Sequence, residues 1–229
     1  MNDKIKAFLD RFNEITTECG RFCFASRAKE FQAEACEKLS ELRQNASVLK
    51  KEMVALNDED SANAMLCIEY MIDALKNELK MWISLKEDNP NSAWSFLVDA
   101  QGTARTAMQA HEVASHLESY IERLLQLEHL LFPPQVFFSP ALVIQSARCS
   151  ICKKEYGECD HLVGKAYMGE MCVREILEIK KLKGVDVVDE PASKHRRVLH
   201  FTHDGITRDF LTWRVISDHS PNNTSERKP

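Results

Sequence analysis

Four cysteines and one histidine between residues 149 and 172 have the residue types and the spacing of metal ligands. Cys149 and Cys152 form a Cys-x2-Cys turn, in which two thiolates can point at one ion while backbone N–H groups donate to the sulfurs. Cys159, His161 and Cys172 follow and offer candidates for the two remaining places of a tetrahedral site. Thiolates select zinc over harder ions such as magnesium. The segment therefore predicts a zinc site.

The spacing leaves the ligand set open, because five candidates compete for four places. We expect Cys149, Cys152, His161 and Cys172 to hold the ion, with Cys159 as the spare ligand. The alternative is that Cys159 takes the place of His161. The glycines between the candidates, at positions 157, 164 and 169, give a tight metal loop the backbone freedom that it needs.

A structural role fits these residues better than a catalytic one. A catalytic zinc keeps an open position beside three protein ligands and has a carboxylate nearby, whereas here the candidates are enough to close the shell. Glu158, Asp160 and Glu170 are typical of solvated charges around a loop. The sequence also lacks the His-x-Glu and Pro-Cys-x-x-Cys signatures of zinc deaminases. We expect the metal to replace part of the hydrophobic core in a domain of roughly 80 residues.

The full motif of this segment is Cys-x2-Cys … Cys-x-His-x2-Gly-x2-Tyr-x-Gly-x2-Cys, at Cys149, Cys152, Cys159, His161, Gly164, Tyr167, Gly169 and Cys172. It resembles a zinc-binding segment of uncharacterised bacterial and phage-encoded proteins. Residues 187–192 and 208–212 are similar to the same proteins. The resemblance covers the chain from about residue 145. It implies a bacterial or phage setting and a zinc-bound module, and it implies no activity.

The elements that must position this site fall into two halves of different composition. Up to residue 132 the chain contains two glycines and one proline, and the others follow. Apolar residues spaced by three and four predict helices over about residues 3–18, 28–56, 61–82, 91–111 and 115–131. Short links between long helices favour antiparallel neighbours. We therefore expect a mainly α fold, with an up-and-down bundle of four or five helices.

A seven-residue repeat in the second predicted helix raises the question of self-association. Ala35, Leu42 and Leu49 recur every seven residues, with Leu39 and Met53 at intermediate positions. Such a stripe is either the core of a bundle or the coiled-coil seam between two copies. We favour the core, because the flanking helices can cover the stripe. We still expect the helical half to bind protein partners or to self-associate into an oligomer.

The C-terminal half has the pattern of a small zinc-stabilised α+β domain. Residues 185–188 predict a short strand, and Asp204-Gly205 between residues 198–201 and 206–210 predicts a hairpin. The resulting division is a helical bundle over 1–132, a linker over 133–147, a zinc-binding α+β domain over 148–219 and a disordered tail over 220–229.

Composition and cysteine usage indicate the compartment. No apolar run approaches the ~18–20 residues that a membrane span needs, and the first residues do not form a secretory signal. Cys36 and Cys67 lie on apolar faces of predicted helices, where a free thiol acts as a small hydrophobic group. Cys19 and Cys23 have no second pair nearby and read as buried thiols. Free thiols and thiolate ligands need a reducing environment, so we expect a cytoplasmic protein.

The charge is distributed unevenly between the two halves. Residues 1–147 contain 15 Lys and Arg against 22 Asp and Glu, whereas residues 148–229 contain 15 against 13. An acidic helical half does not attract nucleic acid. The C-terminal half has a basic stretch, consisting of Lys180, Lys181, Lys183, Lys194, Arg196 and Arg197. We interpret it as a solvated face or as a surface for the acidic bundle. A zinc-dependent nucleic-acid-binding module is an alternative.

A second alternative rests on Arg105 and His111. Their spacing is similar to the Arg-x(4–6)-His pattern of HEPN-type ribonucleases, which are all-helical and cleave RNA without a metal. The resemblance implies that the two residues would meet at a dimer interface, as catalytic residues of an RNA-cleaving effector in phage defence. Thr106 stands where that family usually has a polar Asn, Asp or His. The other interpretation has His111 at the edge of the core and Arg105 in solvent.

Motifs of the common enzyme classes are absent from the sequence. It contains no Gly-rich phosphate loop, no Gly-x-Ser-x-Gly elbow and no His-Glu-x-x-His helix. We therefore expect a non-enzymatic zinc-binding component for protein interaction or assembly in a bacterial or phage system.

Overall fold

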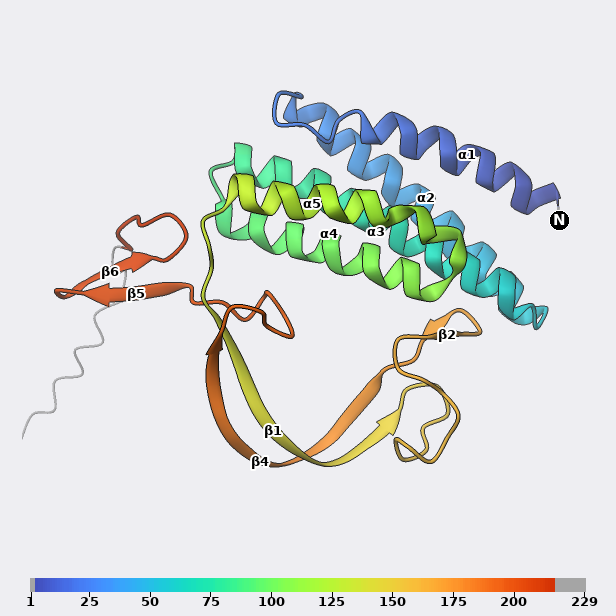
Figure 1. Cartoon of the computed structure of the whole chain (residues 1–229). Helices are drawn as coiled ribbons and strands as arrows, with labels where there is room; N and C mark the ends of the chain where they lie inside the picture. The colour runs from blue at the N-terminus through green and yellow to red at the C-terminus, as the bar shows by residue number, and fades with distance from the viewer. Residues whose placement is uncertain (1–2, 217–229) are drawn as a thin grey trace, which may run out of the picture.

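The computed structural model describes residues 3–216, so the predicted tail over 220–229 lies outside the described residues. Its helices are α1 (Asp3–Gly20), α2 (Lys29–Ala55), α3 (Glu59–Lys86), α4 (Pro90–Ala110), the 3-10 helix η1 (Glu112–Leu117) and α5 (Glu118–Leu131). Successive α-helices run in alternating directions (Figure 1). Short antiparallel strands and the Cys/His cluster follow them. The predicted mainly α fold, a helical bundle followed by a small α+β part, is confirmed.

Polar residues at the helix ends explain the tight links in the bundle. The Asp58 carboxylate accepts a hydrogen bond from the Ser61 N–H and caps α3, at 3.1 Å. The Asn89 side chain caps α4 in the same way through the Ser92 N–H, at 3.2 Å, and a proline occupies the first turn of α4. Each cap follows one short link, and these two links hold α2, α3 and α4 side by side as antiparallel neighbours.

The seven-residue stripe of α2 lies in the core of the bundle. Ala35, Leu39, Leu42, Ala46, Leu49 and Met53 are all buried between neighbouring helices. Leu56, the next member of the repeat, is 70% exposed because it follows the end of α2. The stripe therefore forms part of the core within one chain, as predicted, and is not exposed to form a coiled-coil seam.

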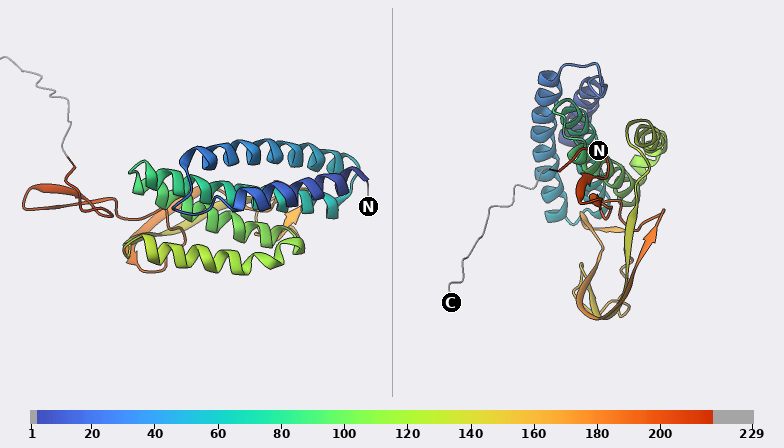
Figure 2. Two further views of the ribbon diagram at one scale, coloured as in Figure 1. Left: turned by 90° about the horizontal axis from the view of Figure 1, so that it is seen from above. Right: turned by 90° about the vertical axis from the view of Figure 1, so that its left-hand side faces the viewer.

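The longest β element is a two-stranded antiparallel ribbon of β1 (Phe137–Cys149) and β4 (Arg174–Val188). The ribbon bows away from the helices and returns to them at its far end (Figures 1 and 2). Two smaller pairs are β2 (Ala166–Tyr167) with β3 (Glu170–Met171), and β5 (His200–His203) with β6 (Ile206–Asp209). The metal-ligand segment therefore lies in the connection between the two ribbon strands.

The strands differ from the sequence expectation in two places. Residues 137–147, expected within a linker, form most of β1. The short strand expected at 185–188 is the end of the 15-residue β4. Both strands are ordered by the hydrogen-bonded ladder between them. This pairing leaves no pattern in the local sequence of either strand. The division into domains stays a prediction. The hairpin at Asp204-Gly205 is confirmed, with φ of 49° and 75° at the two turn residues.

The near end of the ribbon is anchored on the helical bundle. Trp94 of α4 packs against Phe132 and Phe137, and its indole N–H donates to the Lys194 carbonyl at 3.2 Å. The Lys194 ammonium binds the carboxylate of Glu128 on α5 at 2.6 Å. This part of the basic stretch therefore meets the acidic bundle of its own chain, which is one of the two interpretations given above.

Candidate metal centre

Cys149 and Cys152 are presented by the turn that ends β1. The Lys153 N–H donates to the Cys149 carbonyl at 3.0 Å, and the Cys149 N–H donates to the Lys154 carbonyl at 2.9 Å. Lys153 completes the turn with a φ of 61°. This closed turn folds the chain back on itself, so both thiols of the Cys-x2-Cys pair face the same side.

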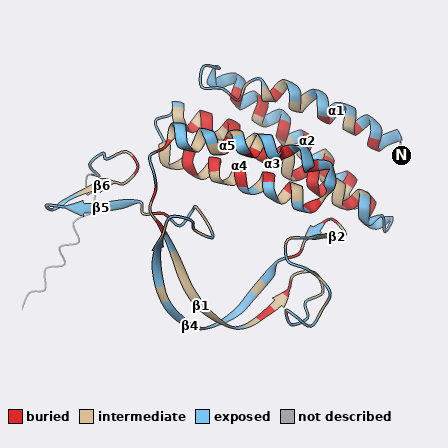
Figure 3. Cartoon of the chain, in the orientation of Figure 1, coloured by how far each residue is buried: buried red, intermediate tan, exposed pale blue. Residues whose placement is uncertain are grey.

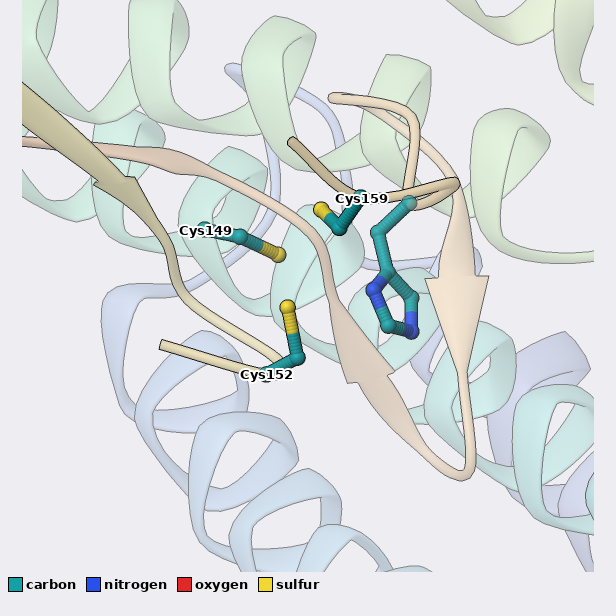
Figure 4. A group of neighbouring side chains, drawn as sticks. Cys149, Cys152 and Cys159 are labelled. Carbon is teal, nitrogen blue, oxygen red and sulfur yellow. The ribbon is translucent and has the colours of Figure 1, made fainter. Parts of the chain in front are cut away.

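The turn and the following loop bring four candidate ligands together. One ligand atom from each of Cys149, Cys152, Cys159 and His161 lies within 4.8 Å of the others, which is close enough for a single metal ion. The three sulfurs of this group point toward one another (Figure 4). Cys172 is buried beside the group, with its Sγ 3.8 Å from that of Cys149. The five sequence candidates are thus gathered at one place, and which four bind stays a prediction.

The pKa of the Cys149 thiol shifts in the opposite direction from the pKa values of Cys159 and Cys172. Hydrogen bonds from the backbone N–H groups of Cys152 and Ile151 lower the pKa of the Cys149 thiol to about 6. Burial and the neighbouring Cys149 raise the pKa of Cys172 to about 11. The His161 N–H lowers the pKa of Cys159, but burial and the adjacent thiols outweigh it and raise that pKa. Cys149 is therefore prepared as the first thiolate, and a bound cation would favour ionisation of the others.

His161 carries an unpaired nitrogen where a ligand is needed. Its Nδ1 is buried and has no hydrogen-bond partner among the described residues. The ring stands edge-on to Tyr167, with the ring centres 4.6 Å apart. The Tyr167 hydroxyl in turn accepts a hydrogen bond from the Leu162 N–H at 2.9 Å and holds the loop in place. A buried imidazole nitrogen without a partner costs free energy, and a metal ion would satisfy it. The residues present therefore fit a zinc ion.

The loop that carries the ligands is fastened to α3 by an asparagine. The Asn63 amide oxygen accepts from the Gly169 N–H at 2.8 Å, and its NH₂ group donates to the Ala166 carbonyl at 3.3 Å. Gly169 has a φ of 77°, and a Cβ there would lie 3.1 Å from the Lys50 side chain on α2. The positive φ thus favours glycine, and any side chain there would also crowd Lys50. Nothing in the local sequence of α3 marked Asn63 as the anchor.

The acidic residues near the cluster lie in solvent. Glu158, Asp160 and Glu170 are all exposed. On the loop side the cluster borders a cavity of about 590 Å³, lined by Cys152, Cys159 and His161 together with neighbouring loop residues. The cluster is therefore closed on the side of the ribbon and accessible from the side of the loop.

Arg105 and His111 occupy different surroundings on α4. His111 ends the helix, where its Nδ1 accepts from the Val113 N–H at 3.2 Å and its Nε2 lies 3.3 Å from the Asp60 carboxylate. Arg105 is exposed and borders a cavity between α4 and residues 191–195. Residues six apart on a helix lie about 120° apart around its axis, so the two would meet only through a second chain. That hypothesis stays a prediction.

Comparison of the chain with protein-family models, curated proteins and solved structures finds no match. Each helix between residues 3 and 216 is too short or too polar to cross a bilayer. Function must therefore be argued from the centre and from the surfaces of this chain.

Proposed function

We propose that this chain is a non-enzymatic assembly protein of a bacterial or phage system, and that its zinc ion is structural. The proposal rests on the place of the cluster. Cys149 is the last residue of β1, and Cys172 stands two residues before β4. A bound zinc would crosslink the two strand ends and the loop between them. The resemblance of residues 149–172 to bacterial and phage-encoded zinc segments supports the setting.

The surroundings of the cluster support a structural role. A ribbon of two strands is marginally stable alone, and its far end is connected through residues 150–173, which have little regular structure. A metal at this point would supply the order that a hydrophobic core supplies elsewhere. Four ligand atoms already lie within bonding reach of one ion, so the protein can fill all four positions of a tetrahedral zinc.

X-ray absorption at the zinc edge tests this proposal directly. A structural centre has only protein ligands, so we expect three Zn–S distances of about 2.3 Å and one Zn–N distance of about 2.0 Å. A Zn–O distance from a bound water would contradict the proposal, because the open position next to the loop-side cavity would then serve chemistry. The variants Cys159→Ser and Cys172→Ser identify the third sulfur, since only the loss of a ligand changes the sulfur count.

A further inference from the structure

The ribbon of β1 and β4 has one face that is apolar over most of its length. Residues paired across an antiparallel ladder share a face, and successive pairs alternate between faces. Counted along the ladder, the first five of the alternate pairs are apolar, and only the last, Cys149 with Arg174, is not: Phe138 with Val187, Pro140 with Val185, Leu142 with Leu182, Ile144 with Ile179, and Ala147 with Ile176. The opposite face carries polar, charged or small pairs such as Ser139 with Asp186 and Arg148 with Glu175. We call the first set the apolar face.

Three bulges keep this face apolar along β4. Leu177, Lys180 and Lys183 have no partner on β1, so each is an extra residue in the ladder. Ile176, Ile179, Leu182 and Val185 recur every three residues, and one bulge between each successive pair returns them to the same side. The bulges therefore keep these apolar residues on one face of β4, although they interrupt the ladder.

Most of the apolar face lies uncovered within one chain, although Ala147 at its far end is buried. At the start of the ribbon Phe137 packs into the bundle core, so the next residue, Phe138, points away from it. Seven side chains of the face are between 38% and 67% exposed: Phe138, Leu142, Ile176, Ile179, Leu182, Val185 and Val187. Figure 3 shows the exposed ribbon next to the buried interiors of the helices. These side chains present on the order of 600 Å², close to the ~800 Å² that each partner contributes to a standard interface.

The edges of the ribbon are less suited to a partner than its face. The bulges and lysines of β4 interrupt its free edge, and Pro140 removes one N–H donor from β1. Addition of a further strand is therefore disfavoured. A partner that lies across the face would bury the apolar side chains, as the second sheet of a sandwich does.

The sequence of β4 and its approach is self-complementary about Ile179. Three residues on either side of Ile179 stand Ile176 and Leu182, and six residues on either side stand Val173 and Val185. A two-fold axis at Ile179 would lay apolar residues on apolar residues.

We propose that the apolar face is covered by the same face of a second copy of this chain, about a two-fold axis through Ile179. This inference rests on the proposed assembly function and names its partner and its surface. The dimer is isologous, so each copy contributes the same seven exposed side chains. The helical stripe, which is already buried in the core, takes no part in it.

Sedimentation of the full-length chain with Ile179→Glu tests the dimer. On the axis each substitution places two carboxylates against each other in an apolar interface, so we expect the dimer dissociation constant to rise at least about 100-fold. Leu130→Glu is the matched control, because Leu130 is 79% exposed on α5 and the same charge there should leave the dimer intact. Zinc content and circular dichroism are recorded on the same samples.

A thiol crosslink tests the position of the axis. In the Ile179→Cys variant the two new thiols face each other, so a short thiol crosslinker should join the copies. Ile176→Cys should join them poorly, because Ile176 lies opposite Leu182 of the other copy. Wild-type chain, with its cysteines held in the zinc centre and the core, sets the background.

A zinc-loaded, folded wild-type chain that stays monomeric would overturn the dimer and leave the structural zinc untouched. A dimer that Ile179→Glu does not weaken would also overturn the inference, as would equal crosslinking by the two cysteine variants. A folded wild-type chain without zinc would instead count against the proposed function.

Discussion

Replacing Cys149 with serine will remove the metal ion and unfold the segment from residue 149 to residue 173. Backbone N–H groups lower the pKa of the Cys149 thiol to about 6, and its sulfur lies beside those of other candidate ligands. Structural zinc contributes about 10–16 kcal/mol of apparent binding free energy in small domains, so we expect a loss of several kcal/mol here. Zinc analysis and thermal melting measure the effect, and amide hydrogen exchange locates it.

Cys36→Ser is the matched control for this variant. Cys36 lies half-buried on α2, where its thiol donates to the Lys76 carbonyl at 3.9 Å. The same chemical change there should leave zinc content unchanged and cost less than about 1 kcal/mol. If Cys149→Ser kept both the zinc and the melting curve of the wild type, the structural-zinc hypothesis would be wrong.

Arg123→Ala will lower the free energy of unfolding by about 3 kcal/mol, because it leaves the Glu78 carboxylate buried without a counter-charge. The Glu78 side chain is fully buried on α3, and Arg123 on α5 binds both of its oxygens at 2.7 and 2.6 Å. Because the Arg123 side chain is 42% exposed, we expect a loss of unfolding free energy at the lower end of the range for broken buried ion pairs. Urea unfolding of the purified chain measures it.

Two variants control the Arg123 prediction. Arg11→Ala breaks the exposed pair with Glu41 and should cost less than about 1 kcal/mol. Adding Glu78→Gln to Arg123→Ala should recover part of the loss, since a neutral amide is cheaper to bury than an unpaired carboxylate. An Arg123→Ala chain with the urea midpoint of the wild type would refute the argument.

The helices and the hairpin could be predicted because their signals are local. Spacings of three and four placed α2 and α3 within a few residues, and Asp204-Gly205 carries its own turn geometry. β4 could not be predicted in full, because its apolar residues recur every three positions. That period fits neither a helix nor a regular strand, and only the bulges reconcile it with a ladder.

The candidate site was predictable as a set of residues but not as a geometry. Spacing identified five candidate ligands, yet it could not rank Cys159 against His161 and Cys172, because the rank depends on how the loop folds back on the ribbon. Asn63 lies more than 100 residues from the loop that it holds, and no local signal marks it. The same holds for the buried Glu78, because its partner Arg123 is 45 residues away.

Native mass spectrometry of the full-length chain, purified without chelator, tests the central claim most directly. We expect one zinc ion for each chain, held in every folded species and absent from Cys149→Ser. A wild-type chain that is folded and free of metal would contradict a structural zinc centre between β1 and β4.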